Sequence, residues 1–104
     1  MIETMSTVFK ALADPTRRGV LELLRSGPMT AGELADNFAV AKSTMSAHFA
    51  ILREANLIEV EKVGKTLVYQ MKVTVLEDAM LAFAQSMRLG LKPALKNKLR
   101  GKLT

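Results

Sequence analysis

The chain has 104 residues, of which 49% are apolar and 24% are charged, a composition typical of one globular domain and unlike that of a disordered chain. It contains no cysteine, which excludes a disulfide framework, a thiolate metal site and a thiol nucleophile. It has no apolar run of about 18 residues and no pattern of a secretory signal at its N-terminus, so we expect a soluble, cytoplasmic protein.

The formal net charge of +5 is unevenly distributed along the chain. Residues 1–91 carry ten basic and ten acidic side chains, so this part of the chain is neutral. The whole excess comes from five basic residues near the C-terminus that have no acidic neighbour: Lys92, Lys96, Lys98, Arg100 and Lys102. A nucleic-acid partner therefore has to be inferred from the residue pattern rather than from the total charge.

The N-terminal part of the chain predicts two helices. Residues 4–12 place apolar side chains at the spacing of one helix face. Asp14 and Pro15 then form a typical helix start, because Asp caps free backbone N–H groups and Pro is tolerated in the first turn. This second helix should end near Arg25, since the segment 26–28 is Ser-Gly-Pro.

Two more helices are predicted before residue 56. Thr30 and Glu33 have the spacing of a capping box and should start a short third helix that runs to about Asn37. Residues 42–55 then predict a longer fourth helix. Its inward stripe consists of Met45, Phe49 and Leu52.

The second half of the chain predicts a hairpin and a closing helix. The β-branched segments 58–63 and 66–71 flank Gly64-Lys65, which predicts the only strand pair of the protein. Thr74 and Glu77 repeat the capping-box spacing and should start a fifth helix. The apolar stripe of this helix consists of Leu76, Met80, Phe83 and Met87. Beyond Pro93, leucines at every fourth position indicate a short final helix.

The order of these elements predicts a mainly helical α+β domain. Two short helices joined by about four residues and followed by a hairpin form a winged helix-turn-helix, with a two-stranded wing. We assign residues 1–91 to this DNA-binding and dimerisation domain. Residues 92–104 form a basic C-terminal tail or a short amphipathic helix.

The outward face of the fourth helix carries small and polar side chains, which allow a helix to enter the major groove of double-stranded DNA. An ordinary solvated face would look similar, but the following hairpin favours the groove-binding role. Glu59 and Glu61 partly offset the basic residues of that hairpin. The predicted DNA contacts are Lys42, Ser43, Thr44, Ser46, Ala47 and His48 on the helix, and Lys62 and Lys65 on the wing.

Five motifs in this order resemble the ArsR-type bacterial winged-helix repressors, over about residues 5–88. They are Asp14-Pro15-Thr16-Arg17-Arg18, Thr30-Ala31-Gly32-Glu33-Leu34-Ala35, Ser43-Thr44-Met45-Ser46-Ala47-His48-Phe49, Leu52-Arg53-Glu54-Ala55-Asn56-Leu57-Ile58 and the Gly64 hairpin. The resemblance implies a homodimer in which the first and fifth helices pair and the fourth helix reads DNA. The expected interface residues are Met5, Val8, Leu76, Met80, Phe83 and Met87.

The apolar stripe of the fifth helix agrees with a dimer, because a domain with a complete three-helix core has little room to bury it. The alternative is that this helix packs only on its own domain. Two-fold symmetry would place the two recognition helices about 34 Å apart and predicts an inverted-repeat operator.

The residues that many members of this family use to sense metals are absent here. Ala35 and Asn37 lie near the usual cysteine positions, and the fifth helix has Glu77 and Asp78 but no histidine. For His48 we favour a phosphate or helix-capping hydrogen bond over metal ligation. We therefore expect no metal and no cofactor, and the chain is most similar to metal-independent autorepressors that a protein partner, often a membrane protein, releases from DNA.

Three further expectations concern charge and chemistry. Arg17 and Arg18 lie where the helix dipole disfavours them, so Arg17 should pair with Asp14 or reach a phosphate. The basic tail gives an alternative function, docking on a membrane or a protein partner, against the simpler reading of a solvated tail. With one histidine, no cysteine and no glycine-rich phosphate loop, the chain is not expected to be an enzyme.

Overall fold

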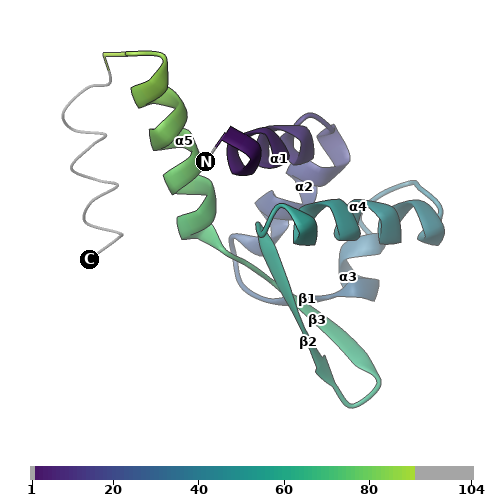
Figure 1. Ribbon diagram of the computed structural model, residues 1–104. Helices are drawn as coiled ribbons and strands as arrows, with labels where there is room; N and C mark the ends of the chain where they lie inside the picture. The colour runs from purple at the N-terminus through teal and green to yellow at the C-terminus, as the bar shows by residue number, and fades with distance from the viewer. Residues whose placement is uncertain (1, 91–104) are drawn as a thin grey trace.

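A computed structural model describes the backbone of residues 2–90 and the side chains of residues 5–90 (Figure 1). The elements in chain order are α1 (Ile2–Leu12), α2 (Pro15–Leu24), β1 (Met29–Thr30), α3 (Ala31–Ala35), α4 (Lys42–Glu54), β2 (Ile58–Val63), β3 (Thr66–Met71) and α5 (Val73–Ser86). The mainly helical winged helix-turn-helix predicted from the sequence is confirmed. The predicted final helix and the assignment of residues 92–104 to a tail lie outside the described residues.

The starts of α2 and α3 follow the sequence prediction closely. Asp14 caps α2 by accepting a hydrogen bond from the backbone N–H of Arg17 at 3.1 Å. At α3, Thr30 accepts from the Glu33 N–H at 3.0 Å and Glu33 accepts from the Thr30 N–H at 2.9 Å, so the capping box is confirmed. The helix ends at Ala35, two residues earlier than predicted.

The sheet has three strands in the order β1-β3-β2, so the prediction of a single strand pair is wrong. The two residues of β1 pair antiparallel with Tyr69 and Val68 of β3. A two-residue strand shows no alternation in the sequence, and only its pairing partner defines it. The hairpin itself is confirmed at its predicted bounds, with Gly64 in the turn at φ +64°.

The predicted capping box at the start of α5 is also wrong. The helix begins at Val73, Lys72 is its N-cap residue, and the Lys72 side chain makes no capping hydrogen bond. The Lys72 N–H donates to the Leu57 carbonyl at 2.8 Å, one step beyond the last β2–β3 pair. The hairpin ladder therefore still holds the backbone of Lys72, and Thr74 already lies inside the helix where it cannot act as the N-cap.

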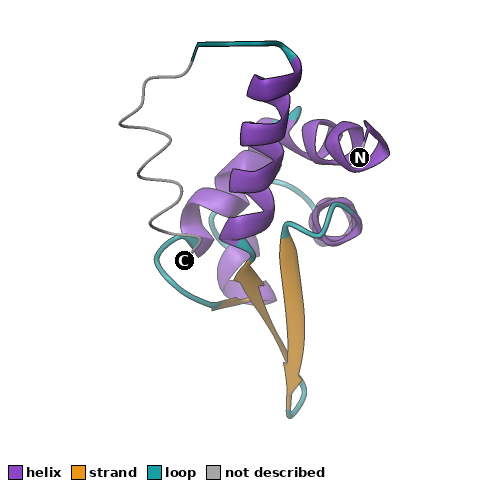
Figure 2. Ribbon diagram, turned by 60° about the vertical axis from the view of Figure 1, so that its left-hand side comes forward, coloured by secondary structure: helices purple, strands orange, loops and turns teal. Residues whose placement is uncertain are grey.

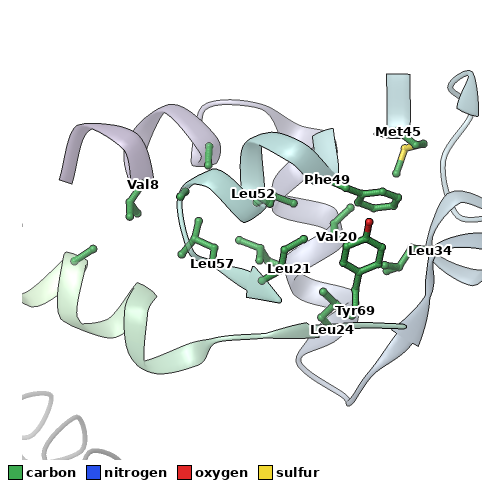
Figure 3. Close-up of a cluster of buried hydrophobic side chains, with 14 residues drawn as sticks. Val8, Val20, Leu21, Leu24, Leu34, Met45, Phe49, Leu52, Leu57 and Tyr69 are labelled. Carbon is green, nitrogen blue, oxygen red and sulfur yellow. The ribbon is translucent and has the colours of Figure 1, made fainter. Parts of the chain in front are cut away.

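The hydrophobic core lies between α1, α2 and α4 and extends onto the hairpin (Figure 3). The three inward residues predicted for α4 are confirmed as buried: Met45, Phe49 and Leu52. The ring of Phe49 packs on Tyr69 with centroids 4.7 Å apart. Burial there raises the pKa of the Tyr69 hydroxyl above its ordinary value of 10.0. This packing fixes the rotation of α4 and leaves its other face in solvent.

Helix α5 returns from the hairpin to pack on α1 (Figure 2). The rings of Phe9 and Phe83 meet edge-on at this contact, with centroids 5.0 Å apart. The β2–β3 hairpin projects away from the helices in both views. Within residues 2–90, none of the helices has both the length and the apolar character that crossing a bilayer requires.

Candidate nucleic-acid interface

The outer face of α4 is built from short side chains that are all exposed. They are Lys42, Ser43, Thr44, Ser46 and Ala47. The N-cap residue is Ala41, whose side chain cannot accept a hydrogen bond. It therefore leaves the first-turn N–H groups of α4 without a side-chain cap. An uncapped helix N-terminus beside a lysine attracts an anion such as a DNA phosphate.

His48, the sixth residue predicted on this face, is placed differently. Only 13% of its side chain is exposed, and the ring lies against the junction of α1 and α2. Its Nδ1 atom lies 3.1 Å from Nη1 of Arg17, and its Nε2 atom lies 3.9 Å from Oδ2 of Asp14. The ring thus has a partner within the protein, Arg17, which differs from the phosphate or helix-capping contact that the sequence predicts.

The Arg17 guanidinium caps the C-terminus of α1. It donates from Nε to the Ala11 carbonyl at 2.8 Å and from Nη2 to the Lys10 carbonyl at 3.0 Å. Arg18 similarly donates to the Leu12 carbonyl at 2.7 Å. The last carbonyls of a helix carry partial negative charge, which compensates the unfavourable position of both arginines in α2.

The predicted ion pair between Arg17 and Asp14 is therefore replaced by another arrangement. Among the described side chains, the guanidinium binds carbonyl groups and the imidazole of His48, while Asp14 binds the backbone N–H of Arg17. That backbone hydrogen bond, together with a smaller contribution from the backbone of Thr16, holds the pKa of Asp14 below its ordinary value of 3.8 against the opposing effect of burial. The sequence did contain a signal for the role of Arg17, because a positive charge near the start of a helix is unfavourable and needs a compensating partner.

The charges of the wing separate onto two faces. Side chains alternate along a strand, so Lys62 lies on the face that packs on α4, whereas Glu59 and Glu61 lie on the other. The two acids line a shallow hollow of about 300 Å³ together with Gln70. Lys62 and Lys65 are both exposed. Because the glutamates lie on the opposite face from Lys62, they neutralise the positive charge of the wing less than the sequence suggests.

The turn between α3 and α4 is anchored by a contact that the sequence reasoning missed. The Phe38 ring lies directly over Gly19 of α2, where a Cβ atom would come within 2.8 Å of the ring. The signal was a glycine in the middle of a predicted helix, which is usually unfavourable without a packing reason. This contact positions the start of α4, and with it the uncapped N-terminus.

The stripe on α5 remains accessible in the single chain. The exposed fractions are 39% for Met80, 36% for Phe83 and 57% for Met87, while Met5 and Leu76 are half-buried. Two further exposed apolar residues were not predicted: Val73 at 41%, at the start of α5, and Leu89 at 52%, after its end. Val8 is completely buried in the core of its own chain and offers no surface to a second copy, so we remove it from the predicted interface.

The known proteins that are similar to this chain are helix-turn-helix transcriptional regulators. A family model described as a helix-turn-helix domain matches residues 12–61. The transcriptional repressor SdpR of Bacillus subtilis is 44% identical over 75 residues, which is 72% of this chain and 83% of SdpR. A crystal structure of an ArsR family transcriptional regulator superposes with a TM-score of 0.76 and 31% identity over 83% of this chain and 94% of its own.

A third match shares the fold at lower identity. It is the solution structure of a homodimeric winged helix-turn-helix DNA-binding domain from Mycobacterium bovis, with a TM-score of 0.66 and 21% identity over 88% of this chain and 89% of its own.

Proposed function

The chain belongs to the ArsR family of winged helix-turn-helix, DNA-binding transcriptional repressors, and we propose that it acts as a metal-independent homodimer on an inverted-repeat operator. Its relatives are transcriptional regulators, which supports a role without catalysis. The observation that carries the proposal is the outward face of α4, where every side chain from Lys42 to Ala47 except buried Met45 is exposed.

We assign direct DNA contacts to this face and to the wing. Ser43, Thr44 and Ser46 offer hydroxyl groups to base edges or phosphates, and Ala47 leaves room for the groove wall. Lys42 lies beside the uncapped start of α4, where a phosphate would gain from both the charge and the backbone N–H groups. We assign to Lys62 and Lys65, which are exposed on the hairpin, contacts with the sugar–phosphate backbone.

A second copy of the chain is the occupant that we assign to the exposed stripe of α5. Apolar side chains contribute about 1.5–3 kcal/mol each when they are fully buried, so covering Met80, Phe83 and Met87 is favourable. The Mycobacterium bovis neighbour, which is described as homodimeric, supports this assignment at the level of the fold. A two-fold axis would place the two α4 helices about 34 Å apart, one turn of DNA, which makes the operator an inverted repeat.

The donor atoms that are available support the proposal of metal independence. The chain has no cysteine, and the side-chain amide of Asn37 donates to the Glu33 carbonyl at 2.8 Å. Glu77 and Asp78 are neighbours on α5 and therefore point about 100° apart. Within the described part of the chain, no group of three or more His, Cys, Asp or Glu side chains is placed to hold a metal ion.

The signal that releases the repressor from DNA is not identified by the contacts described above. Release by a membrane protein or another protein partner stays a prediction.

The alternative function, docking of a basic amphipathic helix, depends on residues 92–104 outside the described structure. Deleting this tail and measuring liposome binding and DNA binding in parallel separates the two functions.

The proposed function is tested by selecting bound sequences from random duplex DNA and titrating the recovered sequence at several salt concentrations. We expect an inverted repeat and an affinity that falls steeply with salt. Lys62→Ala should lower the salt slope by about one unit. Glu61→Gln on the opposite face is the matched control and should leave the slope unchanged. Zn²⁺ or arsenite should not change the affinity, and recovery of no preferred sequence would reject the proposal.

A further inference from the structure

We propose that Arg17 and His48 are positioning residues for DNA recognition, which together fix α4 to the end of α1 without contacting DNA themselves. This inference rests on the proposed function, because it assigns a role to residues behind the DNA-binding face. It also changes our prediction for His48 from a direct contact to an indirect one.

The contact joins three helices through one side chain. The guanidinium of Arg17 on α2 holds the carbonyls of Lys10 and Ala11 at the end of α1 and the Nδ1 atom of His48 on α4. A guanidinium is planar and donates in fixed directions, so hydrogen bonds from three of its nitrogens leave it little freedom. Each of the three helices is therefore held to the other two at this point.

The same geometry sets the tautomer of His48. Arginine has no acceptor, so Nδ1 must accept the hydrogen bond from Nη1 and cannot carry a proton. The proton of the neutral ring is then on Nε2, which faces Asp14 at 3.9 Å. Both ring nitrogens are directed at the protein, and a contact with DNA would require this arrangement to break.

The anchored end of α1 also connects to the proposed dimer surface. Phe9, two residues before Ala11, packs edge-on against Phe83 of α5 at 5.0 Å. The orientation of α4 relative to α5 is therefore set through α1 and Arg17. Binding an inverted repeat requires both recognition helices at the correct angle and spacing, whereas non-specific binding to phosphates does not.

Three variants of the full chain test the role of the contact. His48→Phe keeps an aromatic ring but removes the acceptor, and Arg17→Lys keeps the charge but cannot reach carbonyls and imidazole together. Each should weaken binding to the operator by at least about tenfold, with unchanged affinity for random duplex DNA and an unchanged salt slope. His48→Asn, whose side-chain oxygen can replace Nδ1 as acceptor, should bind within about threefold of wild type.

Nitrogen chemical shifts of the imidazole provide a readout that a merely structural role would not move. In wild type, Nδ1 should show the shift of an unprotonated acceptor both with and without DNA, and in Arg17→Lys this signature should change. A thermal unfolding curve identifies any variant that does not fold. If His48→Phe does not fold, the operator affinities of Arg17→Lys and His48→Asn test the positioning role.

The possible outcomes separate this inference from the proposed function. A wild-type protein without any sequence preference overturns both. A wild-type protein that prefers its operator, together with Arg17→Lys and His48→Phe variants that bind it equally well, overturns the positioning role alone. A His48→Asn variant that is as weak as His48→Phe and has a reduced salt slope also overturns it, because His48 would then contact a phosphate directly.

Discussion

The Phe38 ring lies over the backbone of Gly19, and a methyl group on residue 19 would come within 2.8 Å of the Cε1 atom of that ring. The contact joins the turn before α4 to the middle of α2. In an isolated helix, replacing glycine by alanine stabilises by about 1 kcal/mol. Here the same methyl group must displace the ring, and displacement of a packed side chain costs about 1–3 kcal/mol.

We therefore predict that the sign of Gly19→Ala depends on Phe38. In wild type the substitution should lower the free energy of unfolding by about 1 kcal/mol, because the displaced ring outweighs the helix propensity. In a Phe38→Ala background it should raise the free energy of unfolding by about 0.5–1 kcal/mol. Urea unfolding of the four proteins measures both effects, and a stabilising Gly19→Ala in wild type would show that the ring moves freely.

Two helix caps predict how stability depends on pH. Hydrogen bonds from the backbone of Arg17 and from Thr30 hold the pKa values of Asp14 and Glu33 below their ordinary values of 3.8 and 4.5. A carboxyl group whose pKa is lowered in the folded state stabilises above its unfolded pKa, and this contribution is lost as the pH falls through the folded value.

The urea midpoint should therefore fall as the pH is lowered below about 4.5. Asp14→Asn and Glu33→Gln keep an acceptor at each cap but do not titrate, so the double variant should show a shallower decline between pH 5 and pH 3 than wild type. An unchanged slope would assign the acid sensitivity to other carboxyl groups.

Arg88, the residue after the C-cap of α5, has a backbone conformation that suits glycine. Its φ of +54° is in the left-handed region, and the Leu89 N–H donates to the Ala84 carbonyl at 2.9 Å, as in a typical glycine C-cap. The left-handed conformation costs an L-residue about 1–2 kcal/mol. Arg88→Gly should therefore raise the free energy of unfolding by about 0.5–1 kcal/mol, whereas Arg88→Ala should not. Thermal melts of the two variants give the comparison.

The same substitution should have less effect at the end of α4. Asn56 also has a positive φ, +61°, but asparagine tolerates this region and its side-chain oxygen accepts a hydrogen bond from Lys72 at 2.8 Å. Asn56→Gly loses that bond while it relieves a smaller strain. A gain as large as that of Arg88→Gly would contradict this account.

Local patterns predicted the helices and the hairpin well because the relevant interactions lie within a few residues. The Thr30–Glu33 capping box and the inward stripe of α4 depend on spacings of three and four residues, which the sequence displays directly. The same spacing at Thr74 and Glu77 was misleading, since the end of the hairpin ladder fixes where α5 begins. Spacing alone does not show at which residue the hairpin ladder ends and the helix begins.

Long-range contacts could not be predicted from such patterns. The two residues of β1 are a strand only because Tyr69 and Val68 lie beside them. The Arg17–His48 contact joins residues 31 positions apart, and a helical wheel could place His48 only at the boundary of the exposed face. The sequence predicted which surface of α4 is free, but the support behind that surface required the structure.

The last prediction concerns the exposed stripe of α5. Met80→Glu places a charge in the proposed contact between two copies, where its desolvation opposes association. The dissociation constant of the dimer should rise by at least about tenfold. Gln85→Glu adds the same charge at an exposed position outside the predicted stripe and is the matched control. Sedimentation equilibrium over a dilution series measures both variants and the wild type.

Operator binding should follow the dimer. At protein concentrations where Met80→Glu is monomeric, its affinity for the inverted repeat should fall to that for a single half-site, since the two recognition helices are no longer linked. Gln85→Glu should bind the inverted repeat like wild type. A Met80→Glu protein that remains a dimer, or a wild-type protein that is monomeric when bound to a full operator, would show that α5 is not the surface that pairs the two copies.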